Sequence, residues 1–193
     1  AAAVATRIVM EARGLVQGYS FWAFSDIFSE NYFPSAPFQD GFGLLNLHGI
    51  AKPVYRAFQI LHGMGHELLD LRGTHATVDA WVIMKEKFAT VLMTNVAMPR
   101  HAIQTELVHL RLAGAPPPLT AWIERIDEDH ANPRRLWHMM GEPEYLSAIE
   151  VEQLKRASAL RKEPQPWTRD NGNIELMVAL PPQSIAVVTF EFA

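Results

Sequence analysis

The spacing of apolar residues divides the chain into a first part with helical periodicity and a second part with alternating periodicity. Near the start, three apolar residues share one helical face: Val4, Ile8 and Ala12. Gly14 follows at a position where a helix commonly ends. Beyond Gly73, apolar positions alternate with polar ones, which is typical of strands. This change predicts a domain boundary, with residues 1–72 in one domain and 73–193 in another.

The first domain is predicted to contain two helices, one strand and a long loop. After the first helix, Leu15–Phe24 is short and rich in aromatic residues, which predicts a buried strand. Residues 25–46 combine Pro and Gly with many aromatic rings, which favours an ordered loop with a function. Pro53 then begins a second helix, whose apolar residues lie three and four apart as far as Leu69.

The second domain is predicted to be mostly β. Its six candidate strands are Thr77–Lys85, Phe88–Val96, Ile103–Leu112, Leu119–Ile126, Ile174–Leu180 and Ser184–Phe192. The last two form a hairpin, and the regular spacing indicates a β-sandwich. Two short helices interrupt the strands near residues 132–141 and 147–161, with Asn132 as one N-cap and a capping box of Ser147 and Glu150 at the other. The fold class is therefore α/β plus all-β.

Composition and charge exclude several classes of protein. The 193 residues carry a net charge of −4 and scattered basic residues, which argues against nucleic acid as the main partner. The sequence contains no Cys, so a disulfide framework and a thiolate metal site are excluded. The longest apolar stretches, such as Ala80–Met84, are far shorter than the roughly 20 residues of a membrane-spanning helix. We expect neither nucleic acid nor a membrane as partner.

Two small clusters could suggest metal binding. His62 and His66 lie four residues apart, but no Glu follows His62, so they are interpreted as surface histidines near a helix end. The acidic run Asp127–His130 lacks the ligand spacing of a calcium loop and is interpreted as a solvated turn. No P-loop, dinucleotide-binding or nucleophile-elbow motif is present. The sequence therefore predicts no metal and no cofactor.

The stretch from Tyr19 to Leu44 is the best candidate for a ligand site. Trp22 at the end of the predicted strand, followed by Asp26 and Glu30 in an aromatic loop, is typical of a sugar site. Aromatic faces pack on pyranose C–H bonds, and carboxylates accept hydrogen bonds from hydroxyls. Composition alone leaves a second interpretation open, in which the rings are core and the acids pair locally.

Several ordered motifs resemble the C-terminal part of bacterial β-xylosidases of glycoside hydrolase family 39. The motifs are Tyr-Ser-Phe-Trp-Ala-Phe-Ser-Asp-Ile-Phe-Ser-Glu at 19–30, Pro-Phe-Gln-Asp-Gly-Phe-Gly-Leu at 37–44, and Gly-Ile-Ala-Lys-Pro at 49–53. Residues 125–133 and 137–145 are similar to the family's C-terminal accessory region. The resemblance covers nearly the whole chain.

The resemblance implies the end of a TIM (β/α)8 barrel followed by a β-sandwich accessory domain. Residues 1–13 would be the helix after strand seven, Leu15–Ser25 strand eight, and Pro53–Leu69 the last helix. The acid/base and nucleophile glutamates of this retaining family would lie upstream of Ala1. This chain would then hold no catalytic residue and would be inactive alone.

By the same resemblance, Trp22 floors the subsite of the cleaved sugar and Glu30 binds its hydroxyls. Ser29, Asp26 and Phe38 belong to the same expected substrate-binding set. Two departures from the family leave the glycone open between a pentoside, another neutral sugar and a uronide: Ser29 replaces a frequent Glu, and Gln39-Asp40 replaces His-Gly.

The expected partners are a carbohydrate substrate and either the missing barrel portion or other copies of the chain. A bacterial cytoplasmic and a periplasmic location both fit the sequence. The alternative function is a stand-alone β-sandwich module that binds carbohydrate or protein without catalysis. The gene upstream of Ala1 would distinguish the two.

Overall fold

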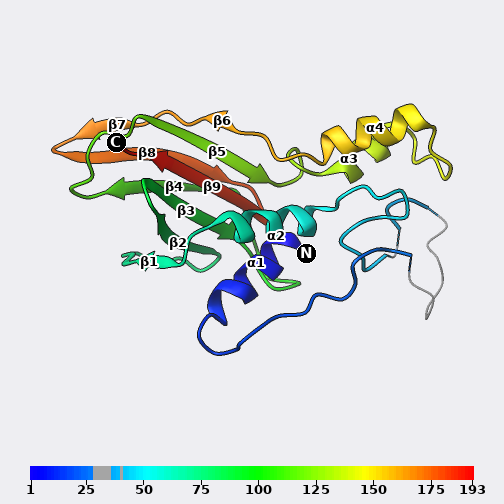
Figure 1. Cartoon of the computed structure of the whole chain (residues 1–193), viewed down its shortest axis with the longest axis horizontal. Helices are drawn as coiled ribbons and strands as arrows, with labels where there is room; N and C mark the ends of the chain where they lie inside the picture. Colours follow the sequence, from blue (N-terminus) through cyan, green and yellow to red (C-terminus); the bar gives the residue numbers. More distant parts are fainter. Residues whose placement is uncertain (28–35, 40) are drawn as a thin grey trace.

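The computed structural model describes residues 1–27, 36–39 and 41–193 (Figure 1). The helices are α1 Ala2–Glu11, α2 Pro53–Gly63, α3 Pro133–Met139 and α4 Ala148–Ala157. The strands are β1 Glu67–Leu69, β2 Val78–Lys85, β3 Phe88–Asn95, β4 Glu106–Leu112, β5 Thr120–Ile126, β6 Glu163–Pro164, β7 Thr168–Asp170, β8 Asn173–Leu180 and β9 Ser184–Glu191. None of these helices is long and apolar enough to cross a membrane, within the part of the chain that is described.

Two antiparallel sheets pack face to face. The larger has the order β1-β2-β3-β9-β5-β6 and the smaller the order β4-β8-β7. Their facing sides bury one core, to which the larger sheet contributes Val91, Val188 and Phe190 and the smaller sheet contributes Ile174 and Leu180, all at 1% exposure or less. Apolar side chains at every second position of each strand form this core, because successive side chains point to opposite faces.

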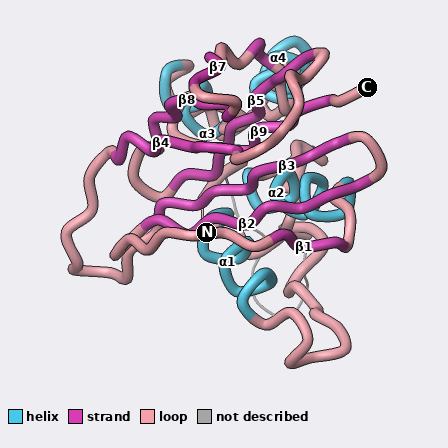
Figure 2. Tube along the Cα trace, turned by 90° about the vertical axis from the view of Figure 1, so that its left-hand side faces the viewer, coloured by secondary structure: helices cyan, strands magenta, loops and turns pink. Residues whose placement is uncertain are grey.

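Helices α1 and α2 cover the other face of the larger sheet. Leu92, adjacent to Val91 in β3, is fully buried on this side with Ile185 of β9. Val54 and Ala57 of α2 pack onto the same cluster. In Figure 2, α1 and β7 lie at opposite ends of the molecule, with the larger sheet between them. Strands β3 and β9 are therefore buried on both faces, which explains their nearly continuous apolar sequences.

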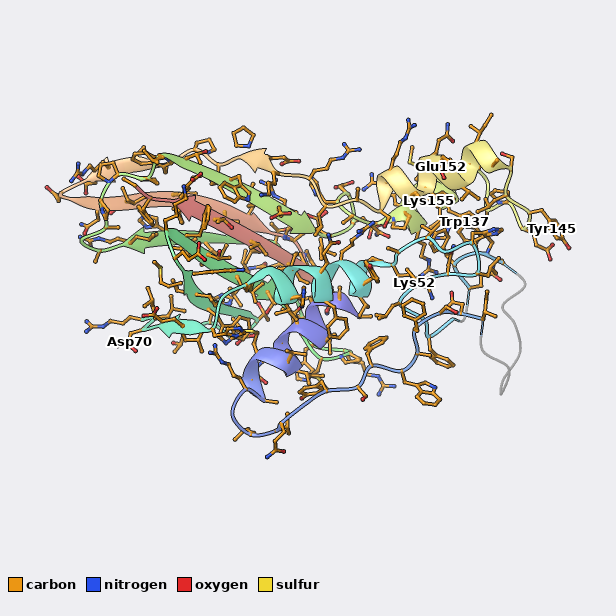
Figure 3. The ribbon with its side chains drawn as sticks, in the orientation of Figure 1. Lys52, Asp70, Trp137, Tyr145, Glu152 and Lys155 are labelled. Carbon is orange, nitrogen blue, oxygen red and sulfur yellow. The ribbon has the colours of Figure 1, made fainter. Side chains whose placement is uncertain are left out.

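Helices α3 and α4 pack against the loop that precedes α2. Trp137 of α3 and Leu154 of α4 share a separate core with Ala36 and Ile50. In Figure 3, Trp137 lies between this helix pair and the loop that precedes α2. The Trp137 indole donates a hydrogen bond to the Pro143 carbonyl at 3.0 Å, so its polar atom is satisfied inside the cluster.

Most of the predicted elements are confirmed. All six strands expected beyond Gly73 are present, and the largest difference is at the start of β4, which begins at Glu106. The capping box is present: Ser147 Oγ accepts from the Glu150 N–H, and the Glu150 carboxylate accepts from the Ser147 N–H. Helices, paired strands and their proportions fit the mixed class expected from the sequence. His62 is exposed, as predicted for a surface histidine.

The predicted strand at Leu15–Phe24 is wrong. These residues form no strand; the pairing nearby is limited to isolated bridges from Arg13 to Val16 and from Ser25 to Leu45. A strand requires a continuous ladder on at least one side, and no described segment runs alongside this stretch for that length. Its apolar side chains are consequently exposed, Leu15 at 79%.

The predicted helix from Pro53 to Leu69 ends early, at Gly63. The chain then crosses β2, where a Cβ on Gly65 would lie 2.2 Å from the Met84 carbonyl oxygen. This close approach requires glycine and directs the following residues into β1, which pairs with β2. The short strands β6 and β7 were not predicted, because two or three residues carry no readable alternation.

Three finer predictions are also corrected. The expected hairpin of the last two strands is wrong, because β8 lies in the smaller sheet and β9 in the larger one. Asn132 occupies the N-cap position of α3, but its side chain makes no capping hydrogen bond and instead donates to the Glu128 carbonyl at 3.4 Å. Asp127 was expected in a solvated turn, yet its side chain is 5% exposed and accepts hydrogen bonds from the backbone of Asp129 and His130. The acidic run is a turn, but the buried Asp127 carboxylate stabilises it by accepting backbone hydrogen bonds.

Candidate functional site

The segment that carries Trp22 is held by backbone hydrogen bonds to the end of the long loop. The Leu44 N–H donates to the Ala23 carbonyl and the Leu45 N–H donates to the Phe24 carbonyl, at 2.9 and 3.1 Å. In return, the Asp26 N–H donates to the Leu45 carbonyl at 2.9 Å. Residues 23–26 and 44–45 therefore form one small backbone unit, and the peptide bond between Trp22 and Ala23 is cis.

Asp26 and Lys52 form an ion pair beneath this unit. Lys52 Nζ lies 2.6 Å from Asp26 Oδ1, and the two side chains are 16% and 1% exposed. The same carboxylate oxygen accepts the Gly43 N–H at 2.7 Å, while Lys52 also donates to the Gly41 carbonyl at 3.0 Å. Asp26 thus binds a backbone N–H of the loop, and Lys52 binds one of its backbone carbonyls.

Gly41 and Gly43 allow the loop to approach so closely. A Cβ on Gly41 would lie 2.2 Å from Asp26 Cγ, and a Cβ on Gly43 would lie 2.2 Å from the Ser25 carbonyl carbon. Both contacts are far inside van der Waals distance, and at Gly43 the obstacle is backbone. The two glycines are required by packing.

The loop then turns back through Asn46 towards α2. The Asn46 side-chain oxygen accepts the N–H groups of His48 and Ile50 at 3.0 and 2.9 Å, and the residue is buried. Gly49 within this turn has a φ of 71°, a left-handed conformation that glycine adopts without strain. Ile50 is fully buried against α3 and α4.

Ser158, which follows α4, holds the base of the loop from a distant part of the chain. Its hydroxyl donates to the Ala51 carbonyl at 2.6 Å, one residue before Lys52. Arg56 of α2 donates to the Ser158 carbonyl and hydroxyl, and burial lowers the pKa of its guanidinium. The α4 terminus, α2 and the loop are joined at one point.

The predicted site residues occupy three different environments. Trp22 is 66% exposed and presents its ring at the surface. Asp26 is 3% exposed and lies below the loop. Phe38 is half-buried against Trp137, with ring centres 5.7 Å apart. Ser29 and Glu30 lie outside the described residues.

Sequence reasoning missed the residues that support the loop. Lys52 was read only as part of a motif, and Gly41, Gly43, Asn46 and Ser158 were not singled out for a role. The Gly-Phe-Gly spacing beside a buried acid was the available signal for the glycines. Ser158 had none, because its partners lie about a hundred residues earlier in the chain. Among the residues that the structure describes, no group of three His, Asp or Glu side chains could hold a metal ion.

Several large apolar side chains of residues 15–42 are exposed. They are exposed by 61–79%: Leu15, Trp22, Phe24, Ile27 and Phe42. The site thus combines a buried, ion-paired support below the loop with an exposed aromatic side chain at Trp22.

The family model described as "Glycosyl hydrolases family 39" matches residues 1–175. The chain therefore belongs to glycoside hydrolase family 39. It is 40% identical over 176 residues to a β-xylosidase of Caldicellulosiruptor saccharolyticus, which covers 90% of this chain and 36% of that protein. It is 30% identical over 192 residues to a β-xylosidase of Geobacillus stearothermophilus, covering 98% of this chain and 37% of that one.

Solved structures of the same family have the same fold. A monomeric β-xylosidase from Caulobacter crescentus CB15 superimposes with a TM-score of 0.83 at 22% identity, over 99% of this chain and 41% of that one. A family 39 enzyme from Xanthomonas axonopodis pv. citri gives a TM-score of 0.78 at 23% identity, over 100% and 40%. The chain thus spans little more than a third of the curated relatives that it matches.

Proposed function

We propose that this chain is the C-terminal part of a retaining, β-xylosidase-like glycoside hydrolase acting on β-xylosides or xylo-oligosaccharides. The observation that carries the proposal is the 40% identity to a β-xylosidase over 90% of the chain. The catalytic pair of carboxylates would lie in the portion of the relatives that this chain does not match. A stand-alone binding module is less favoured, because the family model extends continuously across both parts of the chain.

Residues 1–72 would be the last segment of a TIM barrel and residues 73–193 a β-sandwich, except that β1 at Glu67–Leu69 pairs with β2 and so belongs with the sheets. The two face-to-face sheets support the second assignment. The exposed apolar residues support the first, because Leu15–Ile27 would gain both a ladder and a cover from neighbouring barrel strands. We propose the upstream barrel, rather than a second copy of the chain, as the cover of these residues.

In a retaining mechanism, two carboxyl groups about 5–5.5 Å apart act as nucleophile and as acid/base through a glycosyl-enzyme intermediate. This chain would supply the sugar-holding side. The exposed Trp22 ring would pack on the sugar, and Glu30 would bind its hydroxyls. Hydrogen bonds to sugar hydroxyls that strengthen in the transition state raise the rate as well as the affinity.

Asp26 would act as a positioning residue rather than as a sugar ligand. Its Oδ1 is occupied by Lys52 and Gly43, and the side chain is 1% exposed. Phe38, packed against Trp137, would support the loop in the same way. Of the expected substrate-binding set, Trp22, Glu30 and Ser29 remain the proposed direct contacts.

The test is hydrolysis of an aryl β-xyloside by the 193-residue chain and by a protein extended upstream through a barrel. We expect activity only in the extended protein, and Trp22→Ala there to raise KM or lower kcat at least tenfold. Tyr145→Ala, an exposed aromatic residue on the α3–α4 connection, is the matched control. Activity of the short chain would contradict the placement of the catalytic pair. Activity on an aryl β-glucoside or β-glucuronide instead would reassign the glycone.

A further inference from the structure

A groove lined by aromatic residues lies on the larger sheet, beyond the end of α2. It has a volume of about 400 Å³, which is in the range of small-molecule sites. Strands β3, β5 and β9 form its floor, and the end of α2 and the β2–β3 turn form its walls. The groove exists because α1 and α2 cover only part of this sheet face.

Two aromatic rings line the floor. Phe88 of β3 and Trp122 of β5 meet edge to face, with ring centres 6.1 Å apart. The Trp122 Nε1 atom is buried and has no hydrogen-bond acceptor among the described residues. A buried N–H without an acceptor costs about 1–3 kcal/mol, so a ligand oxygen that reaches it would be favourable; because the atom is covered in this structure, a side chain lining the groove has to move first.

The remaining lining is polar and balanced in charge. Thr90 and Thr189 place their hydroxyl oxygens 3.4 Å apart on the floor. Two lysines and two glutamates line the groove: Lys85, Lys162, Glu86 and Glu124. No ion pair found in the described part of the chain joins any of these four to one another. A neutral ligand rich in hydroxyl groups fits such a lining, because the lining offers hydrogen-bond donors and acceptors while its formal charges cancel.

Lys162 covers the Trp122 ring, with its Nζ 4.3 Å from the ring centre. Lys162 is exposed, and a cation–π contact at an exposed site is worth only about 0.5–1 kcal/mol. A pyranose ring can therefore displace the ammonium group and use the same aromatic face. The displaced ammonium remains available as a donor to a sugar hydroxyl.

We propose that this groove is a second carbohydrate site that binds a neutral β-xylo-oligosaccharide, apart from the site at Trp22. The class of ligand follows from the aromatic floor, the unpaired indole N–H and the balanced charges. The choice of a xylose chain rests on the proposed function. The site would hold a xylan chain on the sheet domain while its end is processed elsewhere.

Affinity electrophoresis in gels containing soluble xylan tests the proposal. We expect xylan to retard the chain and Trp122→Ala to weaken binding at least tenfold, a loss of about 1.4 kcal/mol. Trp122→Phe keeps the aromatic packing but removes the N–H, so it should weaken binding severalfold while the fold is retained. Tyr145→Ala, an 85% exposed aromatic residue on another face, should bind as the unmodified chain does.

Separate outcomes distinguish the two sites. If Trp22→Ala abolishes the retardation and Trp122→Ala does not, the groove is not the site. Absence of retardation would overturn the proposed binding. Equal retardation by hydroxyethylcellulose would overturn the choice of a xylose chain. If the extended protein fails to hydrolyse xylosides while retardation still depends on Trp122, the proposed function fails and the groove proposal stands.

Discussion

Arg56 and Ser158 lie 102 residues apart in the sequence, yet the Arg56 Nε–H donates to the Ser158 carbonyl at 2.7 Å. The serine hydroxyl in turn donates to the Ala51 carbonyl. This small network joins α2, the end of α4 and the base of the loop that packs against the segment of Trp22.

Ser158→Ala is expected to destabilise the chain by about 1–3 kcal/mol, because it leaves the buried Ala51 carbonyl without its donor. Urea unfolding measures this free energy. Ser20→Ala is the control, since Ser20 is exposed and has no recorded partner among the described residues. Equal effects of the two substitutions would show that the network contributes nothing.

Lys52→Met is expected to cost about 3 kcal/mol in the free energy of unfolding, because it leaves the Asp26 carboxylate buried without its cation. The double variant Lys52→Met/Asp26→Asn removes both charges and should recover part of that loss. Lys155→Met removes the exposed pair with Glu152 (Figure 3) and should change stability little. A double variant as unstable as Lys52→Met would contradict the role given to the charge.

Gly43→Ala is expected to destabilise the loop by about 1–3 kcal/mol, since the added Cβ meets the Ser25 backbone. Gly63→Ala is the matched control: its Cβ would meet nothing within 4 Å, and alanine favours the helix that ends there. Urea unfolding should therefore give opposite signs for the two substitutions. A neutral Gly43→Ala would mean that residues 23–26 and 41–45 can separate without cost.

The capping box of α4 predicts a specific dependence on pH. Hydrogen bonds from the Ser147 side chain and backbone lower the pKa of Glu150 from its ordinary value. A carboxylate with a lowered pKa in the folded state stabilises the fold above its unfolded pKa of about 4.3, and this contribution is lost as pH falls through the folded value.

The difference in urea midpoint between Glu150→Gln and the unmodified chain should therefore be largest at neutral pH and shrink below pH 4. Glu144→Gln, an exposed residue outside the box, should show no such trend. A difference that is constant with pH would assign the effect to helix propensity instead.

The sheets could be predicted from the sequence because their strands carry their own signal. Strands β5 and β8 alternate over seven or eight residues, whereas β3 and β9 are nearly continuous apolar runs of eight residues, as expected for strands buried on both faces. The stretch after Gly14 has strand composition but no partner ladder among the described residues, so local preference could not decide its conformation.

The candidate site was predictable only in part. Trp22 was recognisable from its motif as a candidate ring for a sugar site, whereas the burial of Asp26 depends on Lys52, 26 residues later. The link from Ser158 to Ala51 spans 107 residues and has no local pattern at all. Contacts between distant side chains are set by tertiary packing, which periodicity does not report.

The core that Trp137 and Leu154 share with Ala36 and Ile50 means that substitutions in the α3–α4 pair affect the packing of the loop before α2. A chimera that takes residues 73–193 from a relative would bring a new α3–α4 surface against an old loop. Close packing tolerates such a mismatch poorly, so the loop and the helix pair would have to be exchanged together. Substitutions in the loop before α2 and in the α3–α4 pair would therefore accumulate together in this chain.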